Sequence, residues 1–143
     1  LAAGKDANIA EVCAYLSEVG LCARDYIDRE LDASLSGGEL KRIEIAMVLA
    51  RGTALSVFDE PEAALSPQRQ LTLLAEIYEC AKAGAQFFIV THSPILLGIP
   101  DADIYCFDRD RLHLCDYEET GSYQITKMFV NNRQALLRNL LND

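Results

Sequence analysis

The order strand, helix, strand between residues 54 and 91 constrains the fold more than any other feature of this sequence. Two apolar runs, 54–58 (ALSVF) and 86–90 (QFFIV), have the length of short strands, and polar residues follow each run directly. Because helical segments flank these runs, each is expected to be a buried strand of a parallel sheet. The pattern predicts the α/β fold class, in which ligands bind at the carboxyl ends of the strands.

Helical periodicity predicts the segments around these strands. Residues 9–19 carry apolar side chains at helical spacing and stop at Gly20. The helix between the strands has Ser66 as its N-cap and Pro67 at its first position, and Gly84 ends it. Its apolar face is expected to comprise Leu71, Leu74, Ile77 and Tyr78. The rest of the chain predicts an antiparallel hairpin of residues 103–107 and 111–115 and two terminal helices, 123–130 and 133–141.

A further helix, predicted from Glu39 to Arg51, begins beside two adjacent glycines. Ser36 and Glu39 have the spacing of a capping box, in which each side chain satisfies a backbone N–H of the other residue. Gly37 and Gly38 would then form the first turn and leave its N–H groups uncovered. Such a helix end can bind an anion, because its free amides and the helix dipole both favour negative charge. An ordinary capped helix explains the segment equally well, and both interpretations stay open at this point.

Two neighbouring carboxylates and one histidine stand where the predicted strands end. Asp59 and Glu60 follow the first strand, and His92 follows the second. The edge of the sheet where these strands end is called the rim. Two carboxylates at the rim can have different catalytic roles, because one can hold Mg²⁺ while the other orients or deprotonates an attacking water. If the two strands are neighbours, His92 comes out on the same rim, within reach of a phosphate or of that water. The alternatives are that the acidic pair caps the turn at Pro61 and that His92 is structural.

Composition and charge exclude several classes of protein. The chain has 143 residues, 50% of them hydrophobic, so it is long enough for one domain with a core and is not expected to be disordered. Its net charge of −9, with no basic patch beyond Lys41 and Arg42, argues against direct binding of nucleic acid. No apolar run approaches the roughly 18 residues of a membrane span, so direct membrane insertion is not expected.

The five cysteines are expected to be buried free thiols. They are an odd number, and no two have the C-x-x-C spacing that is typical of zinc sites. Cys106 and Cys115 fall in strand-like runs, and Cys13 and Cys80 fall in helix-like ones. A cysteine in such a segment is usually a small buried apolar residue. This usage predicts a reducing, cytoplasmic location.

Four short motifs, in this order, resemble the nucleotide-binding domain of ABC-type ATPases, a family of P-loop NTPases. Residues 35–39 (LSGGE) are similar to the signature motif, and residues 55–60 (LSVFDE) are similar to the Walker B strand with its following glutamate. Residues 62–66 (EAALS) are similar to the D-loop, and residues 90–93 (VTHS) are similar to the switch-histidine loop. The resemblance implies binding and hydrolysis of ATP, with Mg²⁺ as a cofactor, in a head-to-tail dimer of two ATPase subunits.

The resemblance also implies a role for each matching residue. Asp59 would serve Mg²⁺, Glu60 would polarise the attacking water, and His92 would contact the γ-phosphate. Residues 36–39 would bind the γ-phosphate of ATP held by the other subunit of the dimer. The two uncovered glycines would then have a use beyond starting a helix.

The sequence departs from the family pattern at three places. The phosphate loop, G-x-x-x-x-G-K-[ST], is absent from the 143 residues, no glutamine loop precedes the Walker B strand, and Ser66 stands where the D-loop usually has Asp. The chain is therefore expected to be one partial ABC-type domain over residues 1–143, with a helical subdomain and signature helix at 1–52 and the Walker B strand to the C-terminal helices at 53–143. The alternative is a non-catalytic dimerisation or regulatory module without its own phosphate loop.

The two halves of the chain resemble different relatives within this family. Residues 34–52 are most similar to the ATPase of the Suf iron–sulfur assembly system. Residues 59–70, 91–97 and 117–132 are similar to small stand-alone ATPases of the ABC/AAA type. A membrane-bound partner of the parent protein is compatible with this resemblance.

Overall fold

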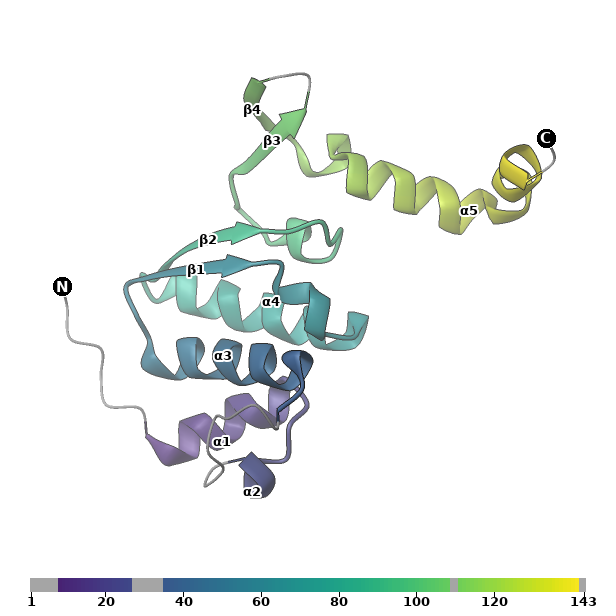
Figure 1. The fold of residues 1–143 in the computed structure, drawn as a ribbon. Helices are drawn as coiled ribbons and strands as arrows, with labels where there is room; N and C mark the ends of the chain where they lie inside the picture. The colour runs from purple at the N-terminus through teal and green to yellow at the C-terminus, as the bar shows by residue number, and fades with distance from the viewer. Residues whose placement is uncertain (1–7, 27–34, 109–110, 142–143) are drawn as a thin grey trace. The chain divides into compact units, whose positions relative to one another are not determined.

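The structure, a computed structural model, describes residues 8–26, 35–108 and 111–141. The chain divides into two units, Leu1–Thr91 and His92–Asp143, and each unit is described by itself (Figure 1). The first unit contains the parallel strands and the capped helix, and the second contains the hairpin and the C-terminal helix.

The two predicted core strands form a parallel pair in the first unit. Strand β1 (Leu55–Asp59) pairs with β2 (Gln86–Val90). The register sets Asp59 opposite Val90, so the carboxyl ends of both strands meet at one edge. Helix α4 (Pro67–Lys82) makes the crossover between them, which parallel strands require. The predicted α/β fold class is confirmed.

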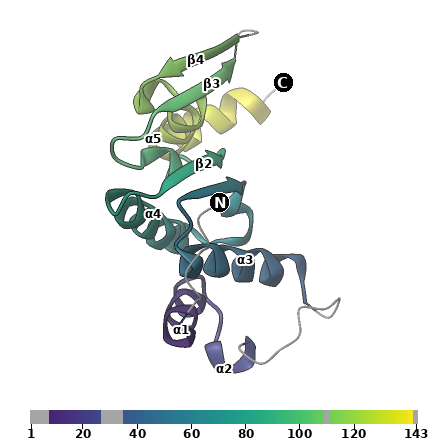
Figure 2. The ribbon, with the colours of Figure 1, turned by 90° about the vertical axis from the view of Figure 1, so that its left-hand side faces the viewer.

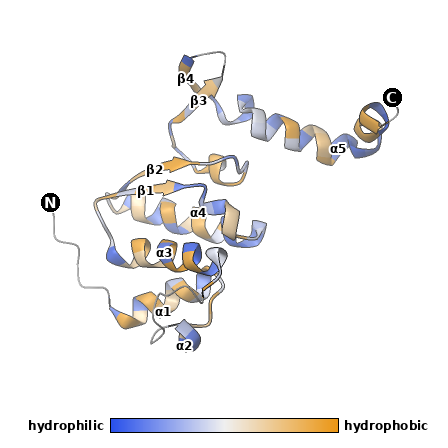
Figure 3. Ribbon diagram, in the orientation of Figure 1, coloured by the Kyte–Doolittle hydropathy of each residue, from blue (hydrophilic) through white to orange (hydrophobic). Residues whose placement is uncertain are grey.

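Helix α3 (Gly37–Arg51) is fixed beside the end of β1. It lies between the sheet and α1 (Ile9–Glu18), which the short helix α2 (Ala23–Tyr26) follows (Figures 1 and 2). Its buried residues are Ile43, Ile45, Ala46, Leu49 and Ala50. They contact α1 and the turn η1 (Pro61–Ala64) that comes after β1. In Figure 3, hydrophobic and hydrophilic residues alternate along α3, as in a helix that is buried on one side.

Glycines end helices α1 and α4, as predicted. Gly20 and Gly84 have φ angles of 86° and 101°, in the left-handed region that favours glycine. The guanidinium of Arg69, on α4, donates hydrogen bonds to the backbone carbonyl oxygens of Ser17 and Glu18. The Ser17 carbonyl also accepts from the N–H of Gly20 at 3.1 Å. Arg69 therefore adds to the hydrogen bonding at the end of α1, and it ties α1 to α4.

The sheet is buried on one face only, which corrects the prediction of fully buried strands. On that face, Phe58 is 6% exposed and its ring lies 6.0 Å from the ring of Phe87. The opposite face is apolar and exposed, with Leu55, Val57, Phe88 and Val90 between 52% and 67% exposed. Successive side chains of a strand point to opposite faces, and the described helices of the first unit cover one of the two. Parallel sheets usually carry helices on both faces, so this surface has the composition of a covered one.

The residues that helix α4 buries differ slightly from its predicted apolar face. Leu73 and Ile77 are buried, with exposures of 3% and 2%, whereas Leu71 is 56% exposed. Leu73 and Ile77 lie one turn apart on the same face, and Leu74 and Tyr78 are half-buried next to them. Leu71 precedes this face by two positions, about 200° around the helix. The prediction that Leu71 belongs to the apolar face of this helix was therefore wrong.

The second unit contains the predicted hairpin. Strands β3 (Ile104–Asp108) and β4 (Arg111–Cys115) pair antiparallel. A short helical turn, η2 (Leu96–Gly98), comes before the hairpin, and another, η3 (Tyr117–Glu119), follows it. The prediction of this antiparallel pair is confirmed, with the first strand one residue later than expected.

Helix α5 (Gly121–Leu141) consists of two helical segments. Asn132 lies inside it with non-helical φ and ψ angles of −131° and 31°. The predicted terminal helices, 123–130 and 133–141, fall on either side of this kink, so both are confirmed. Within the described ranges, every helix is too short or too polar to cross a membrane.

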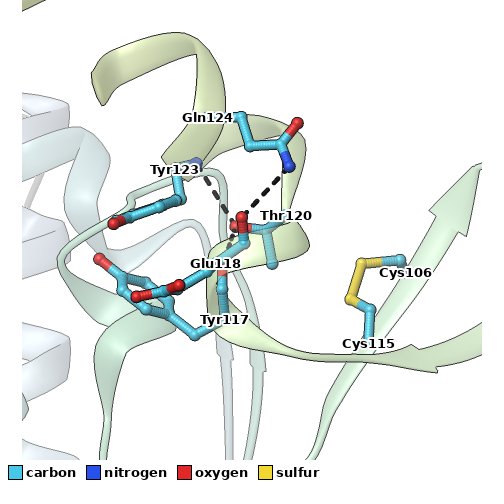
Figure 4. Close-up of a disulfide and its surroundings, with 7 residues drawn as sticks. All are labelled: Cys106, Cys115, Tyr117, Glu118, Thr120, Tyr123 and Gln124. Atoms are coloured by element: carbon cyan, nitrogen blue, oxygen red, sulfur yellow. Dashed lines mark hydrogen bonds between the residues drawn. A yellow bond between two sulfur atoms is a disulfide. The ribbon is translucent and has the colours of Figure 1, made fainter. Parts of the chain in front are cut away.

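Cys106 and Cys115 form a disulfide across the hairpin, which corrects the prediction of five free thiols (Figure 4). In the register, Cys115 stands opposite Ile104, two residues from Cys106, so both cysteines lie on the same face of the hairpin. Their Cα atoms are 6.4 Å apart, within the range of disulfides. Spacing along the chain does not reveal this pairing, because the strand register creates it. Structural disulfides are rare in the cytosol, so the cysteines no longer support a reducing compartment.

The disulfide leads to a prediction about thiol content. Without reductant, the unfolded chain should contain three reactive thiols, those of Cys13, Cys22 and Cys80, and after reduction it should contain five. Closing a loop of this length stabilises the fold by about 2–3 kcal/mol in the chain-entropy account, so reduction should also destabilise the second unit. Thiol titration in denaturant measures both states, and a Cys106→Ser, Cys115→Ser double variant is the control. Five reactive thiols in the non-reduced chain would contradict the pairing.

Candidate functional site

A capping box begins helix α3, as predicted. The backbone N–H of Glu39 donates to Ser36 Oγ at 3.2 Å, and the backbone N–H of Ser36 donates to Glu39 Oε2 at 2.8 Å. The hydroxyl of Tyr26, at the end of α2, donates to the other carboxylate oxygen of Glu39. The Glu39 side chain is therefore held from two directions, which fixes the first turn of α3.

Gly37 and Gly38 are not explained by the fold of the described residues. Both are exposed, and a Cβ built on either would meet no atom within 4 Å in the part of the chain that the structure describes. Neither has the positive φ that requires glycine, unlike Gly52 at the other end of the helix. Each glycine costs a helix about 1 kcal/mol relative to alanine. Two glycines that neither packing nor backbone conformation requires favour the interpretation of an uncovered helix end that binds an anion.

Asp59 and Glu60 lie together at the carboxyl end of β1, and both are exposed. Glu60 has φ 45° and ψ 55°, in the left-handed region that residues with a side chain rarely adopt. Its N–H donates to the carbonyl oxygen of Val90 at 2.8 Å, one position beyond the last paired residues of the sheet. The ammonium group of Lys41, on α3, donates to the backbone carbonyl of Asp59. The rim is thus held by contacts from β2 and from α3.

The turn after Glu60 is held by a buried proline and by backbone hydrogen bonds. Pro61 is fully buried and starts η1, and the N–H of Ala63 donates to the carbonyl of Glu60 at 3.1 Å. Glu60 occupies the N-cap position of η1, yet its side chain makes no capping hydrogen bond. The interpretation of Glu60 as a turn cap therefore has no support in the geometry.

An open hollow lies next to Asp59, between α3 and β1. Its volume is about 400 Å³, and it is lined by Lys41, Glu44, Ile45, Val48, Val57, Phe58, Asp59 and Pro61. Among the described residues, no group of three or more His, Cys, Asp and Glu side chains could hold a metal ion by itself. Mg²⁺ is commonly bound through one or two carboxylates together with substrate phosphates. An exposed Asp59 beside an open hollow fits that mode of binding.

His92 begins the second unit and is exposed. The next residue, Ser93, is buried, and its hydroxyl oxygen accepts hydrogen bonds from the N–H groups of Ile95 and Leu96 at 3.1 and 3.3 Å. The histidine therefore directly precedes a well-formed turn. Because His92 and Glu60 belong to different units, their position on one rim stays a prediction.

Residues 62–66, which resemble the D-loop, end at the start of α4. Ser66 is the N-cap of α4, as predicted, but its side chain makes no capping hydrogen bond. Instead, the side-chain amide of Gln70 donates to the carbonyl of Leu65 at 3.1 Å. Leu65 itself is buried, so the backbone of this segment is held in place while Ser66 stays exposed.

Sequence reasoning missed three side chains that support these segments. They are Tyr26, which contacts Glu39, Lys41, which contacts the backbone of Asp59, and Tyr117, whose hydroxyl donates to the carbonyl of Pro94 at 2.8 Å. Tyr117 lies in residues 117–132, and the resemblance of this segment to stand-alone ATPases is the one feature of the sequence that points to it. Tyr26 and Lys41 carry no such signal, because their contacts depend on the tertiary fold.

Comparison with known proteins gives a family for these motifs. Residues 33–98 match the family described as "AAA domain, putative AbiEii toxin, Type IV TA system". The histidine transport ATP-binding protein HisP of Pseudomonas aeruginosa is 34% identical over 88 residues, which are 62% of this chain and 34% of that protein. The thiamine import ATP-binding protein ThiQ of Cereibacter sphaeroides is 39% identical over 95 residues, 66% of this chain and 38% of that protein. The glutamine transport ATP-binding protein GlnQ of Escherichia coli is 36% identical over 77 residues, 54% of this chain and 31% of that protein.

The chain spans about a third of the length of these curated relatives. The family match, residues 33–98, contains all four motifs, from LSGGE to VTHS. The closer likeness of residues 34–52 to the Suf ATPase, and of the later segments to stand-alone ATPases, stays a prediction. The parallel α/β pair, the family match and the ATP-binding relatives agree with one another. In sequence and in its parallel strand pair, the chain is similar to part of an ABC-type ATPase nucleotide-binding domain.

Proposed function

We propose that this chain takes part in ATP binding and hydrolysis within an ABC-type ATPase, and that it supplies the signature motif, the Walker B carboxylate, the catalytic glutamate and the switch histidine. The observation that carries this proposal is the backbone of Glu60, held at φ 45° directly after β1 with its carboxylate exposed beside Asp59. A left-handed backbone at a non-glycine residue costs about 1–3 kcal/mol, and such residues cluster at functional sites.

The proposed chemistry divides the work among four positions. Glu60 orients the attacking water and accepts its proton. Asp59 holds Mg²⁺ together with phosphate oxygens, and the ion neutralises phosphate charge. His92 contacts the γ-phosphate. Residues 36–39 bind the γ-phosphate of ATP held by the other subunit, through the N–H groups at the uncovered start of α3.

The proposed assembly is a head-to-tail dimer of two ATPase subunits, each of which completes the other's site. In this proposal, residues 1–52 and 53–143 are the two parts of one partial domain, and the phosphate loop comes from a part of the parent protein outside the 143 residues. Direct binding of nucleic acid is not part of the proposal, because the net charge of −9 repels phosphate backbones. The proposal also includes a membrane-bound partner and a cytoplasmic location, and the location rests on the resemblance to ABC-type ATPases, not on the cysteines.

The isolated chain is expected to bind Mg-ATP poorly, whereas the complete parent protein should bind and hydrolyse it. In P-loop proteins, the amides and the lysine of the phosphate loop supply most of the contacts to the triphosphate. Isothermal titration calorimetry of both proteins, with phosphate release measured for the parent, tests this difference. Micromolar affinity in the isolated chain would contradict it. A parent protein that neither binds nor hydrolyses ATP would favour the non-catalytic module instead.

A further inference from the structure

The segment that begins with His92 precedes the hairpin in the sequence, and a tyrosine that follows the hairpin holds it. Residues 92–98 are called the His92 loop below. The hydroxyl of Tyr117, in η3, donates to the backbone carbonyl of Pro94 at 2.8 Å. Its ring also lies against Gly98, where a Cβ would meet two ring carbons at 3.6 Å. One side chain therefore contacts the His92 loop at two points.

The hydrogen bonds that the backbone N–H groups of residues 95–98 donate are local. The Ser93 hydroxyl accepts from the N–H groups of Ile95 and Leu96, and the N–H of Leu97 donates to the Ser93 carbonyl at 3.0 Å. The N–H of Gly98 donates to the carbonyl of Ile95 at 3.0 Å. These bonds shape the turn but join residues within it. The bond from Tyr117 adds a contact from 23 residues further along the chain, so it fixes the loop against η3.

Tyr117 is itself held in place by the start of α5 (Figure 4). Thr120 is 3% exposed, and its hydroxyl donates to the carbonyl of Tyr117 at 2.8 Å. The ring of Tyr123 lies 4.7 Å from the ring of Tyr117, measured between centroids. Burial, followed by the neighbouring Tyr123, raises the pKa of the Tyr117 hydroxyl. The hydroxyl therefore stays protonated at neutral pH and remains a donor to Pro94.

We propose that Tyr117 is a positioning residue for His92, which acts by fixing the His92 loop to the C-terminal turn η3. This inference rests on the proposed function, in which His92 contacts the γ-phosphate. A histidine that begins a loop needs that loop in one conformation, because a catalytic contact tolerates only small displacements. Residues 117–124 (YEETGSYQ) thereby acquire a role in a region without any of the four nucleotide-binding motifs.

The test compares Tyr117→Phe with Tyr123→Phe. The first variant removes the hydroxyl that reaches Pro94 and keeps the ring against Gly98. The second removes a hydroxyl from the same aromatic pair, one that contacts Lys127 at 3.1 Å rather than the loop. Turnover of Mg-ATP is measured in the complete parent protein, and hydrogen exchange of the amides of residues 95–98 is measured in the 143-residue chain.

Tyr117→Phe is expected to lower kcat about fivefold, the effect of one hydrogen bond, and to leave KM for ATP within about twofold. Exchange of the loop amides should become faster by a similar factor in this variant. Tyr123→Phe should stay within about twofold of the wild type in both measurements. A merely structural tyrosine pair would give equal effects in the two variants, which would overturn the inference.

Two other outcomes would also overturn it. Unchanged kcat in Tyr117→Phe would show that the loop does not need this bond, and a lower kcat without faster exchange would show that the hydroxyl acts by another route. Failure of the proposed function has a different signature, because the wild-type parent would then not hydrolyse ATP at all. In that case faster exchange in Tyr117→Phe would confirm the contact, while the role in positioning His92 for hydrolysis would fall with the proposed function.

Discussion

Replacing Glu60 by Gln in the complete parent protein is expected to lower ATP turnover at least ~100-fold, while ATP still binds. Glutamine keeps the size of the side chain but loses the negative charge that orients water and accepts its proton, and loss of a general base has an effect of this order. The backbone hydrogen bonds of Glu60 and the burial of Pro61 do not depend on the charge of the side chain, so the substitution should leave the rim intact. Steady-state phosphate release and equilibrium binding of ATP measure the two effects separately.

Glu79→Gln is the matched control for Glu60→Gln. Glu79 lies on α4 with its side chain 67% exposed, and its one described ion pair, with Lys82 at 3.5 Å, is a surface pair. Such pairs contribute at most about 1 kcal/mol, so this variant should hydrolyse ATP at the wild-type rate. Near-normal hydrolysis in Glu60→Gln would leave Asp59 and Glu60 as residues of a tight turn and remove the main support of the proposed function.

Local patterns in the sequence predicted the elements of the fold and the composition of the rim. The spacing of Ser36 and Glu39 predicted a capping box, and both of its hydrogen bonds are present. Two apolar runs with polar ends predicted parallel strands, and their register brings Asp59 opposite Val90. These features are encoded within a few residues of one another, because caps, helix ends and strand periodicity depend on near neighbours.

The features that sequence reasoning missed depend on contacts between distant residues. Leu71 has the same apolar character as Leu73, and only the packing of α4 decides which of them is buried. The pairing of Cys106 with Cys115 follows from the hairpin register rather than from cysteine spacing. The exposure of one face of the sheet was missed for a similar reason. An apolar run indicates that a strand surface is suited to burial, but it does not identify a segment that covers this surface.

Replacing Gly38 by Asp is expected to abolish ATP-dependent dimerisation of the parent protein while its melting temperature barely changes. If the start of α3 binds the γ-phosphate held by the other subunit, the new side chain would place a negative charge against a negative ligand. The fold should tolerate it, because a Cβ at Gly38 meets no atom of the described residues within 4 Å and Asp is favourable in the first turn of a helix. Size-exclusion chromatography with light scattering, with and without Mg-ATP, measures dimerisation, and calorimetry measures melting.

Two control variants separate charge at the site from charge elsewhere. Ala10→Asp introduces the same side chain at the corresponding position of α1, two residues after its N-cap Asn8, where the original residue is also exposed. It should dimerise normally with ATP. Gly38→Ala adds a methyl group without charge and should weaken dimerisation less than Gly38→Asp does, with a melting temperature equal to or above that of the wild type, because alanine is the better helix former. Unchanged dimerisation in Gly38→Asp would mean that the two glycines only begin a helix, and residues 35–39 would then form a capping box without a ligand.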